Sequence, residues 1–103
     1  MIANRSYPIE KPLEGLESFY QEFLTNRLKE FQELQGALGS KDFKAIAEMA
    51  HKWKGFCEPY GFGQLGIIAR ELEEMAKANE AKKCSDLLGD VEHYLAHKKT
   101  TSP

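Results

Sequence analysis

The sequence of 103 residues predicts an all-α fold, an antiparallel up-and-down four-helix bundle with a short N-terminal lead-in segment. Two observations lead to this fold class. Apolar side chains recur at steps of three and four residues along four stretches, which is the spacing of one buried stripe on each helix. The β-branched residues that favour strands are scarce. Between residues 12 and 98 they are Thr25, Ile46, Ile67, Ile68 and Val91.

The first helix is expected between Pro12 and Gly39. Proline is favoured at the first helical position, and glycine commonly terminates a helix. The apolar stripe of this helix comprises Leu16, Tyr20, Phe23, Leu24, Leu28, Phe31, Leu34 and Leu38. Aromatic residues are most simply core residues, and those expected there are Phe19, Tyr20, Phe23, Phe31, Phe43 and Trp53.

The second helix is expected to follow at once, because Ser40 and Asp42 offer an N-cap directly after the glycine stop. It should end near Pro59, since the segment EPYGFG at residues 58–63 holds one proline and two glycines and is the clearest break in the second half of the chain. The apolar stripe of this helix comprises Phe43, Ile46, Ala50, Trp53 and Cys57.

Two further helices are expected after this break, and short connections favour antiparallel neighbours. The third carries the stripe Leu65, Ile68, Leu72, Met75 and Asn79, and the fourth carries Cys84, Leu87, Leu88, Val91, Tyr94 and Leu95. Residues 1–11 should form a lead-in that packs across one end of the bundle. Residues 98–103 are expected to be a frayed tail.

The length fits a single domain, which we expect to span residues 1–103 with a core at roughly residues 13–97. Bundles of this size often stand alone, so a monomer is expected. Met1 at the start and the sequence TTSP at the end favour a complete small protein over a domain excised from a longer chain.

The charge balance excludes several classes of partner. The net charge is −2, with 14 basic and 16 acidic side chains interleaved, whereas nucleic-acid binding usually requires a positive excess on one face. No apolar run approaches the roughly 18 residues that span a bilayer. Residues 1–11 lack the pattern of a signal peptide. We therefore expect a cytoplasmic protein that binds neither nucleic acid nor membrane.

Neither the cysteines nor the C-terminal histidines indicate a metal site or a disulfide. Cys57 and Cys84 both continue apolar stripes, so buried thiols are expected. His93 and His97 have the i,i+4 spacing of a helical metal site. No third ligand is apparent, and histidines near a helix C-terminus also suit the helix dipole. We expect neither a metal nor a cofactor in this chain.

His51 is the candidate for chemistry, because it lies opposite the apolar stripe of the second helix. A neutral imidazole with an open nitrogen is a nucleophile near pH 7. Gly55, one turn later, costs about 1 kcal/mol in a helix relative to alanine, and its merit is that it leaves the imidazole accessible on that flank. Ala47 clears the other flank.

Lys54 places a positive charge one turn from the same histidine, where it would attract an anion. Residues 41–54 contain four lysines against one aspartate and one glutamate, so this helix is locally basic in an acidic chain. The anion best matched to a nucleophilic histidine is a phosphoryl group. Lys44 and Lys52 are candidates for contact with a partner, although lysines at such positions are more often plain solvated charges.

These motifs resemble the histidine-containing phosphotransfer (HPt) domain family. The similarity rests on AHKWKG at residues 50–55, YGFGQL at 60–65 and LEEMA at 72–76, and it covers roughly residues 13–95. The family signature has a lysine three residues and a glycine four residues after a helical histidine, with another glycine about ten residues after it. Here these are Lys54, Gly55 and Gly61, counted from His51.

The resemblance implies that His51 accepts a phosphoryl group at Nε2 and exchanges it with aspartates of receiver domains, or receives it from a hybrid histidine kinase. Lys54 would orient and neutralise the phosphoryl group, and Gly55 would admit the receiver. Such a domain is not itself an enzyme, because the receiver supplies the metal ion and the acidic pocket. The resemblance therefore implies a phosphocarrier of a multistep phosphorelay.

Some members of the family also have a glutamate on the next helix that hydrogen-bonds Nδ1 of the histidine. Glu73 lies 22 residues after His51, at the matching distance. Glu74 is the alternative, because a one-residue error in the loop would exchange the two. Such a bond would fix the tautomer and leave Nε2 as the nucleophile.

Two other readings remain open. One is a non-catalytic helical module that sequesters a signalling partner, and the other is a phosphotransfer domain excised from a kinase. In either case the partner surface is expected around the histidine, with contacts from Lys44, Ala47, Lys52 and Glu58.

Overall fold

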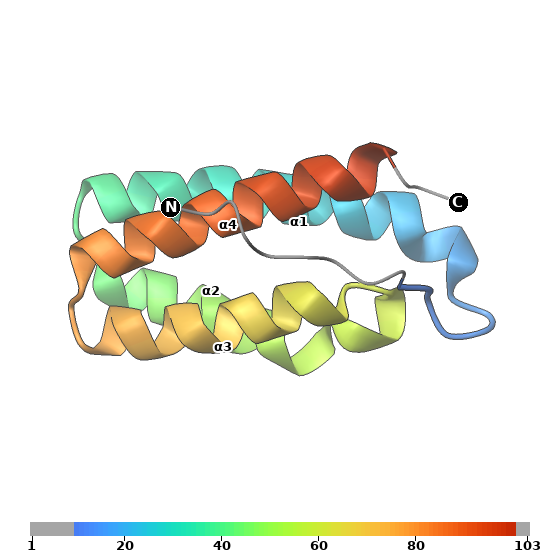
Figure 1. The fold of residues 1–103 in the computed structure, drawn as a ribbon, viewed down its shortest axis with the longest axis horizontal. Coiled ribbons are helices and arrows are strands. Elements are labelled where there is room, and N and C mark those ends of the chain that lie inside the picture. Colours follow the sequence, from blue (N-terminus) through green and yellow to red (C-terminus); the bar gives the residue numbers. More distant parts are fainter. Residues whose placement is uncertain (1–9, 101–103) are drawn as a thin grey trace.

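The structure is a computed structural model that describes residues 10–100, and it contains four α-helices and no strand within them (Figure 1). The helices alternate in direction along one long axis, which confirms the all-α up-and-down bundle. α1 and α3 lie diagonally across the bundle, and each packs against both α2 and α4. The elements are η1 (Glu17–Phe19), α1 (Tyr20–Gly39), α2 (Phe43–Phe56), η2 (Glu58–Tyr60), α3 (Gly63–Lys77) and α4 (Ala81–Thr100).

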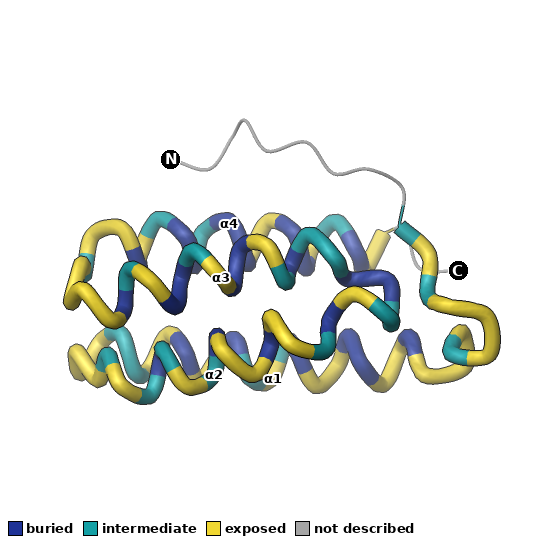
Figure 2. The backbone as a smooth tube through the Cα atoms, turned by 90° about the horizontal axis from the view of Figure 1, so that it is seen from below, coloured by how far each residue is buried: buried dark blue, intermediate teal, exposed yellow. Residues whose placement is uncertain are grey.

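Buried positions recur along each of the four helices, as the dark blue parts of the tube show (Figure 2), and their side chains form the core. The predicted stripes supply most of this core. On α2, Ile46, Ala50 and Trp53 are fully buried, and so is Cys57 just after the helix. Large fully buried side chains from the other elements are Leu34, Phe62, Leu65, Ile68, Leu72, Val91, Tyr94 and Leu95.

The first helix begins at Tyr20, so the predicted start at Pro12 is wrong. The chain is held in an irregular turn here, because the Leu13 N–H donates to the Pro59 carbonyl at 2.8 Å and Gly15 has φ +94°. Phe19 is 47% exposed rather than part of the core. It directly precedes the helix, and its neighbour Tyr20 takes the inward position.

The third helix ends at Lys77, before the predicted Asn79. Asn79 is exposed and has φ 57°, a left-handed conformation that asparagine tolerates better than most residues. Its N–H donates to the Ala76 carbonyl at 3.0 Å, which closes the helix end. The apolar stripe of α3 therefore stops at Met75 and Ala76.

The predicted frayed tail is wrong for residues 98–100, because α4 continues to Thr100. Lys98 is only 3% exposed. Its ammonium donates to the Gly61 carbonyl at 2.6 Å and lies 3.0 Å from the Glu10 carboxylate. Burial of the aliphatic stem and pairing of the charge together order this last turn. Residues 101–103 lie outside the described part of the chain.

Glu10 ties the described end of the lead-in to two helices. Its carboxylate accepts hydrogen bonds from the Tyr94 hydroxyl at 2.5 Å and from the Gln64 N–H at 2.7 Å. The second bond satisfies a free N–H in the first turn of α3. The lead-in was predicted to pack across one end of the bundle, and Glu10 is the part of it whose contacts with the helices are described. Residues 1–9 lie outside the described residues.

Gly61 is required by its conformation and by its neighbours. It has φ +89°, and a Cβ there would lie 2.8 Å from the backbone nitrogen of Pro12.

We predict that Gly61→Ala lowers the free energy of unfolding by about 1–3 kcal/mol, measured by urea denaturation. Gly36→Ala is the matched control, because no atom lies within 4 Å of a Cβ there. Gly36→Ala in α1 should raise the free energy of unfolding by about 0.5–1 kcal/mol. An unchanged free energy of unfolding for Gly61→Ala would contradict the assignment.

Candidate functional site

The rotation of α2 is fixed by its buried face, and this fixes where His51 points. The Asp42 side chain caps the helix by accepting from the Ala45 N–H at 3.1 Å. Trp53 is fully buried, and its indole N–H donates to the Glu30 carboxylate on α1 at 2.7 Å. With that face turned inward, the His51 side chain remains 68% exposed on the other side of the helix.

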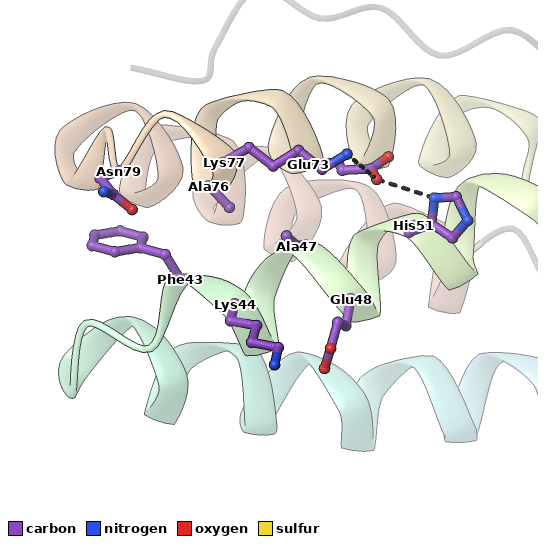
Figure 3. A pocket seen from close by; sticks show the side chains of 9 residues that line it. All are labelled: Phe43, Lys44, Ala47, Glu48, His51, Glu73, Ala76, Lys77 and Asn79. Atoms are coloured by element: carbon purple, nitrogen blue, oxygen red, sulfur yellow. Dashed lines mark hydrogen bonds and ion pairs between the residues drawn. The ribbon is translucent and has the colours of Figure 1, made fainter.

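His51 contacts Glu73 of α3. The Nδ1 atom of the imidazole lies 3.0 Å from Oε2 of the carboxylate, and the other ring nitrogen points away from it (Figure 3). Glu73 is 5% exposed, so the carboxylate approaches the ring from within the α2–α3 interface. The sequence left Glu73 and Glu74 as alternatives. Glu74 is exposed, and Glu73 makes the contact.

Two lysines complete the surroundings of this carboxylate. The Lys54 ammonium lies 2.7 Å from Oε1, and the Lys77 ammonium lies 3.1 Å from Oε2. The hydrogen bond from Lys54 lowers the pKa of Glu73 most, burial opposes it, and the contacts from Lys77 and His51 lower it further. The resulting pKa is about 2, compared with an ordinary value of 4.5. Glu73 is therefore a carboxylate near neutral pH.

The ionised carboxylate determines the tautomer of the neutral imidazole. A carboxylate can only accept hydrogen bonds, so Nδ1 of His51 must carry the proton that is shared with Glu73. The lone pair is then on Nε2. Among the described residues, no hydrogen bond to this second nitrogen is formed. In the neutral ring, the geometry thus presents an exposed nitrogen with a free lone pair on the packed α2–α3 pair.

Two glycines lie at this site, one between α2 and α3 and one beside the imidazole. At Gly66, a Cβ would lie 3.9 Å from the Lys54 Cα, so α3 packs close to the backbone of α2. At Gly55, one turn after His51, no atom lies within 4 Å of the place that a Cβ would occupy. The flank of the imidazole is therefore open on the side where the sequence predicted access.

The sequence model of the Hpt domain matches residues 18–100, most of the chain. The chain belongs to the Hpt domain family. Comparisons with curated proteins and with solved structures returned no significant match. An Hpt domain is a histidine phosphotransfer module of a phosphorelay, a carrier rather than a catalytic domain. The resemblance seen in the motifs around His51 is thereby confirmed at the level of the family.

An open groove of about 700 Å³ extends from His51 of this Hpt domain along α2 and α3. Ala47 and Ala76 lie between the two helices, while Phe43 and Asn79 lie together at the end away from His51 (Figure 3). The complete lining is Phe43, Lys44, Ala47, Glu48, His51, Glu73, Ala76, Lys77 and Asn79. Two of the predicted partner-binding residues, Lys44 and Ala47, are among them.

The other two predicted partner-binding residues lie elsewhere. Lys52 is exposed on the side of α2 that faces α1, and its ammonium lies 3.5 Å from the Glu30 carboxylate. Glu58 begins η2 and lines a separate, smaller groove with Lys54, Gly63, Ile67 and other residues. Neither residue therefore lines the groove that contains His51.

Lys77 is the site residue that sequence reasoning missed. A signal was available, because Glu73 and Lys77 have the i,i+4 spacing and the order that favour an ion pair on a helix. This spacing could be recognised as part of the site only once the structure placed Glu73 against His51. Every element of the site thus comes from α2 or from α3.

The remaining candidates from the sequence are a metal site and the two thiols. Within residues 10–100, no group of three histidine, cysteine or acidic residues could hold a metal ion. Cys57 and Cys84 are free and buried, and burial raises the pKa of the Cys57 thiol to about 12, which suppresses the reactive thiolate. None of the helices in the described part of the chain is long and apolar enough to cross a membrane.

The depressed pKa of Glu73 predicts a pH dependence of stability. Because its pKa is about 2 in the folded protein and 4.5 ordinarily, its contribution is complete above pH 4.5 and is lost as the pH falls towards 2. Urea unfolding across this range should show a larger loss for the wild type than for Glu73→Gln. Glu74→Gln is the matched control and should follow the wild type. Equal acid profiles for all three proteins would contradict the assignment.

Proposed function

We propose that this chain is a phosphocarrier that accepts a phosphoryl group on Nε2 of His51 and exchanges it with aspartates of receiver domains. A hybrid histidine kinase is a further possible donor. One observation carries the proposal, namely the ionised Glu73 at Nδ1 with the opposite nitrogen of the ring exposed. Membership of the Hpt family supports the same chemistry.

In the transfer step, the phosphoryl group moves from an aspartate oxygen of the receiver to the ring nitrogen of His51. The Nε2 lone pair attacks the phosphorus of an aspartyl phosphate, an N–P bond forms, and the bond from phosphorus to the aspartate oxygen breaks. The aspartate leaves as a carboxylate with the electron pair. The Nδ1 proton stays on the ring, which becomes an imidazolium bearing the phosphoryl group. Glu73 then stabilises a positive charge that develops during the reaction.

The remaining residues have supporting roles in this proposal. Lys54 neutralises and orients the phosphoryl group, and Gly55 leaves room for the receiver. The groove that contains Lys44 and Ala47 receives the docked partner, while Lys52 and Glu58 contact its edges. The receiver supplies the metal ion and the acidic pocket, so the chain needs no cofactor. It acts as a cytoplasmic monomer.

The direct test is incubation with a receiver that carries a labelled aspartyl phosphate. The wild type should acquire label that is labile to acid and stable to base, as expected for a phosphohistidine. His51→Gln should acquire none, while His93→Gln should label like the wild type. Equal labelling of His51→Gln would refute the acceptor. Receiver binding without any labelling of the wild type would instead favour the non-catalytic binding module.

Gly55 gives a separate test of access. Gly55→Gln should preserve the fold and raise stability by about 0.5–1 kcal/mol, because glutamine is the better helix former. Phosphotransfer from a receiver should fall by more than about tenfold, which corresponds to a loss of at least about 1.4 kcal/mol in the free energy of docking. Gly36→Gln on α1 also enters open space and should leave transfer unchanged. Unimpaired transfer by Gly55→Gln would contradict the role of this glycine.

A further inference from the structure

Glu73 has three donors, and they are divided unequally between its two oxygens. Oε1 is paired with Lys54 at 2.7 Å. Oε2 is shared by Nδ1 of His51 at 3.0 Å and by Lys77 at 3.1 Å. The two lysines come from different helices. Lys54 is on α2, and Lys77 is on α3, where Figure 3 shows it beside Glu73.

In the unphosphorylated protein, Lys54 is therefore already engaged. Its ammonium pairs with Glu73, whereas the proposed function requires it to neutralise a phosphoryl group on His51. A phosphoryl group carries more negative charge than a single carboxylate and offers three acceptor oxygens. Once it is attached to Nε2, it competes with Glu73 for Lys54. In the proposed phosphorylated state, the Lys54 ammonium moves from Oε1 to the phosphoryl group.

If Lys54 left and no other cation contacted Glu73, the carboxylate would be a buried charge without a positively charged partner. The carboxylate is 5% exposed, and a buried charge that loses its partner is strongly destabilised. Protonation or rotation of the side chain would relieve this cost, but either would weaken the hydrogen bond to Nδ1. The imidazolium formed by phosphorylation needs that bond most.

Lys77 is placed to prevent this loss. It lies one turn after Glu73 on the same helix, so the pair does not depend on the position of α2. It contacts the oxygen that faces His51, rather than the oxygen that Lys54 occupies. Its side chain is 66% exposed in the groove, where no other acidic side chain of the described residues pairs with it.

We propose that Lys77 is a positioning residue that keeps the Glu73 carboxylate against Nδ1 of His51 while Lys54 moves to the phosphoryl group. The proposal deepens the proposed function and rests on it for the phosphorylated state. In the unphosphorylated protein either lysine alone is sufficient to hold Glu73. Lys77 becomes necessary only when Lys54 is absent from the carboxylate.

The substitution Lys54→Met imitates the state in which Lys54 has left. The measured quantity is the fraction of His51 in the Nδ1–H tautomer, read from the ¹⁵N chemical shifts of the ring at about pH 8, where an ordinary histidine is neutral. Lys54→Met and Lys77→Met should each keep the wild-type tautomer. The double variant Lys54→Met with Lys77→Met should lose it, and Lys54→Met with Lys77→Arg should retain it.

The matched control is Lys54→Met combined with Lys82→Met. Lys82 forms the same kind of i,i+4 ion pair, with Asp86 on α4, and its removal should leave the tautomer intact. A retained tautomer in the Lys54→Met, Lys77→Met protein would overturn the proposal, as would its loss in the control. Loss in Lys77→Met alone would also overturn it, because Lys54 would then be unable to hold the carboxylate.

Phosphorylation by the small donor phosphoramidate gives the functional readout without a receiver. The Lys54→Met, Lys77→Met protein should label on His51 at least about threefold more slowly than Lys54→Met alone, because the buried Glu73 carboxylate then has no lysine to hold it against Nδ1. Equal rates would contradict the proposal. Failure of the wild type to label would count against the proposed function, while the tautomer comparison would still decide the role of Lys77.

Discussion

The interaction on which the site depends is the hydrogen bond between His51 and the buried carboxylate of Glu73. It fixes which ring nitrogen carries the proton, and so it determines which nitrogen can act as a nucleophile. It is available near neutral pH because Lys54 and Lys77 keep the carboxylate ionised in a position that burial alone would disfavour. The orientation of the imidazole and the charge of Glu73 therefore depend on one connected group of contacts, which joins His51, Glu73 and the two lysines.

The bundle supports this interaction by holding two antiparallel helices close together. On α2, burial of Trp53 turns His51 outward. The packing of α3 against α2 brings the Glu73 carboxylate to within 3.0 Å of the imidazole. The rest of the core holds these helices in register. A carrier needs little more, because one exposed nitrogen and an open flank at Gly55 are sufficient if a partner brings the remaining catalytic groups.

The sequence predicted what depends on local spacing and failed where distant segments meet. Periodicity identified the helices and the outward face of His51, because a buried stripe determines the opposite face. It left Glu73 and Glu74 open, since the choice depends on the residue at which α3 begins. It also misjudged Lys98, whose burial depends on Glu10 and on the Gly61 carbonyl, groups far away in the chain. Charged residues are placed by such partners, and periodicity does not reveal them.

The central claim is that the Glu73 carboxylate keeps Nδ1 of His51 protonated, so that Nε2 is the atom that accepts the phosphoryl group. The most direct test is to phosphorylate protein with ¹⁵N-labelled histidine and to determine, from the scalar coupling between phosphorus and nitrogen, which ring atom of His51 bears the phosphoryl group. The account predicts coupling to Nε2, with Nδ1 still protonated. Phosphorus bound to Nδ1 would contradict it, because that atom would then have been free of the Glu73 carboxylate.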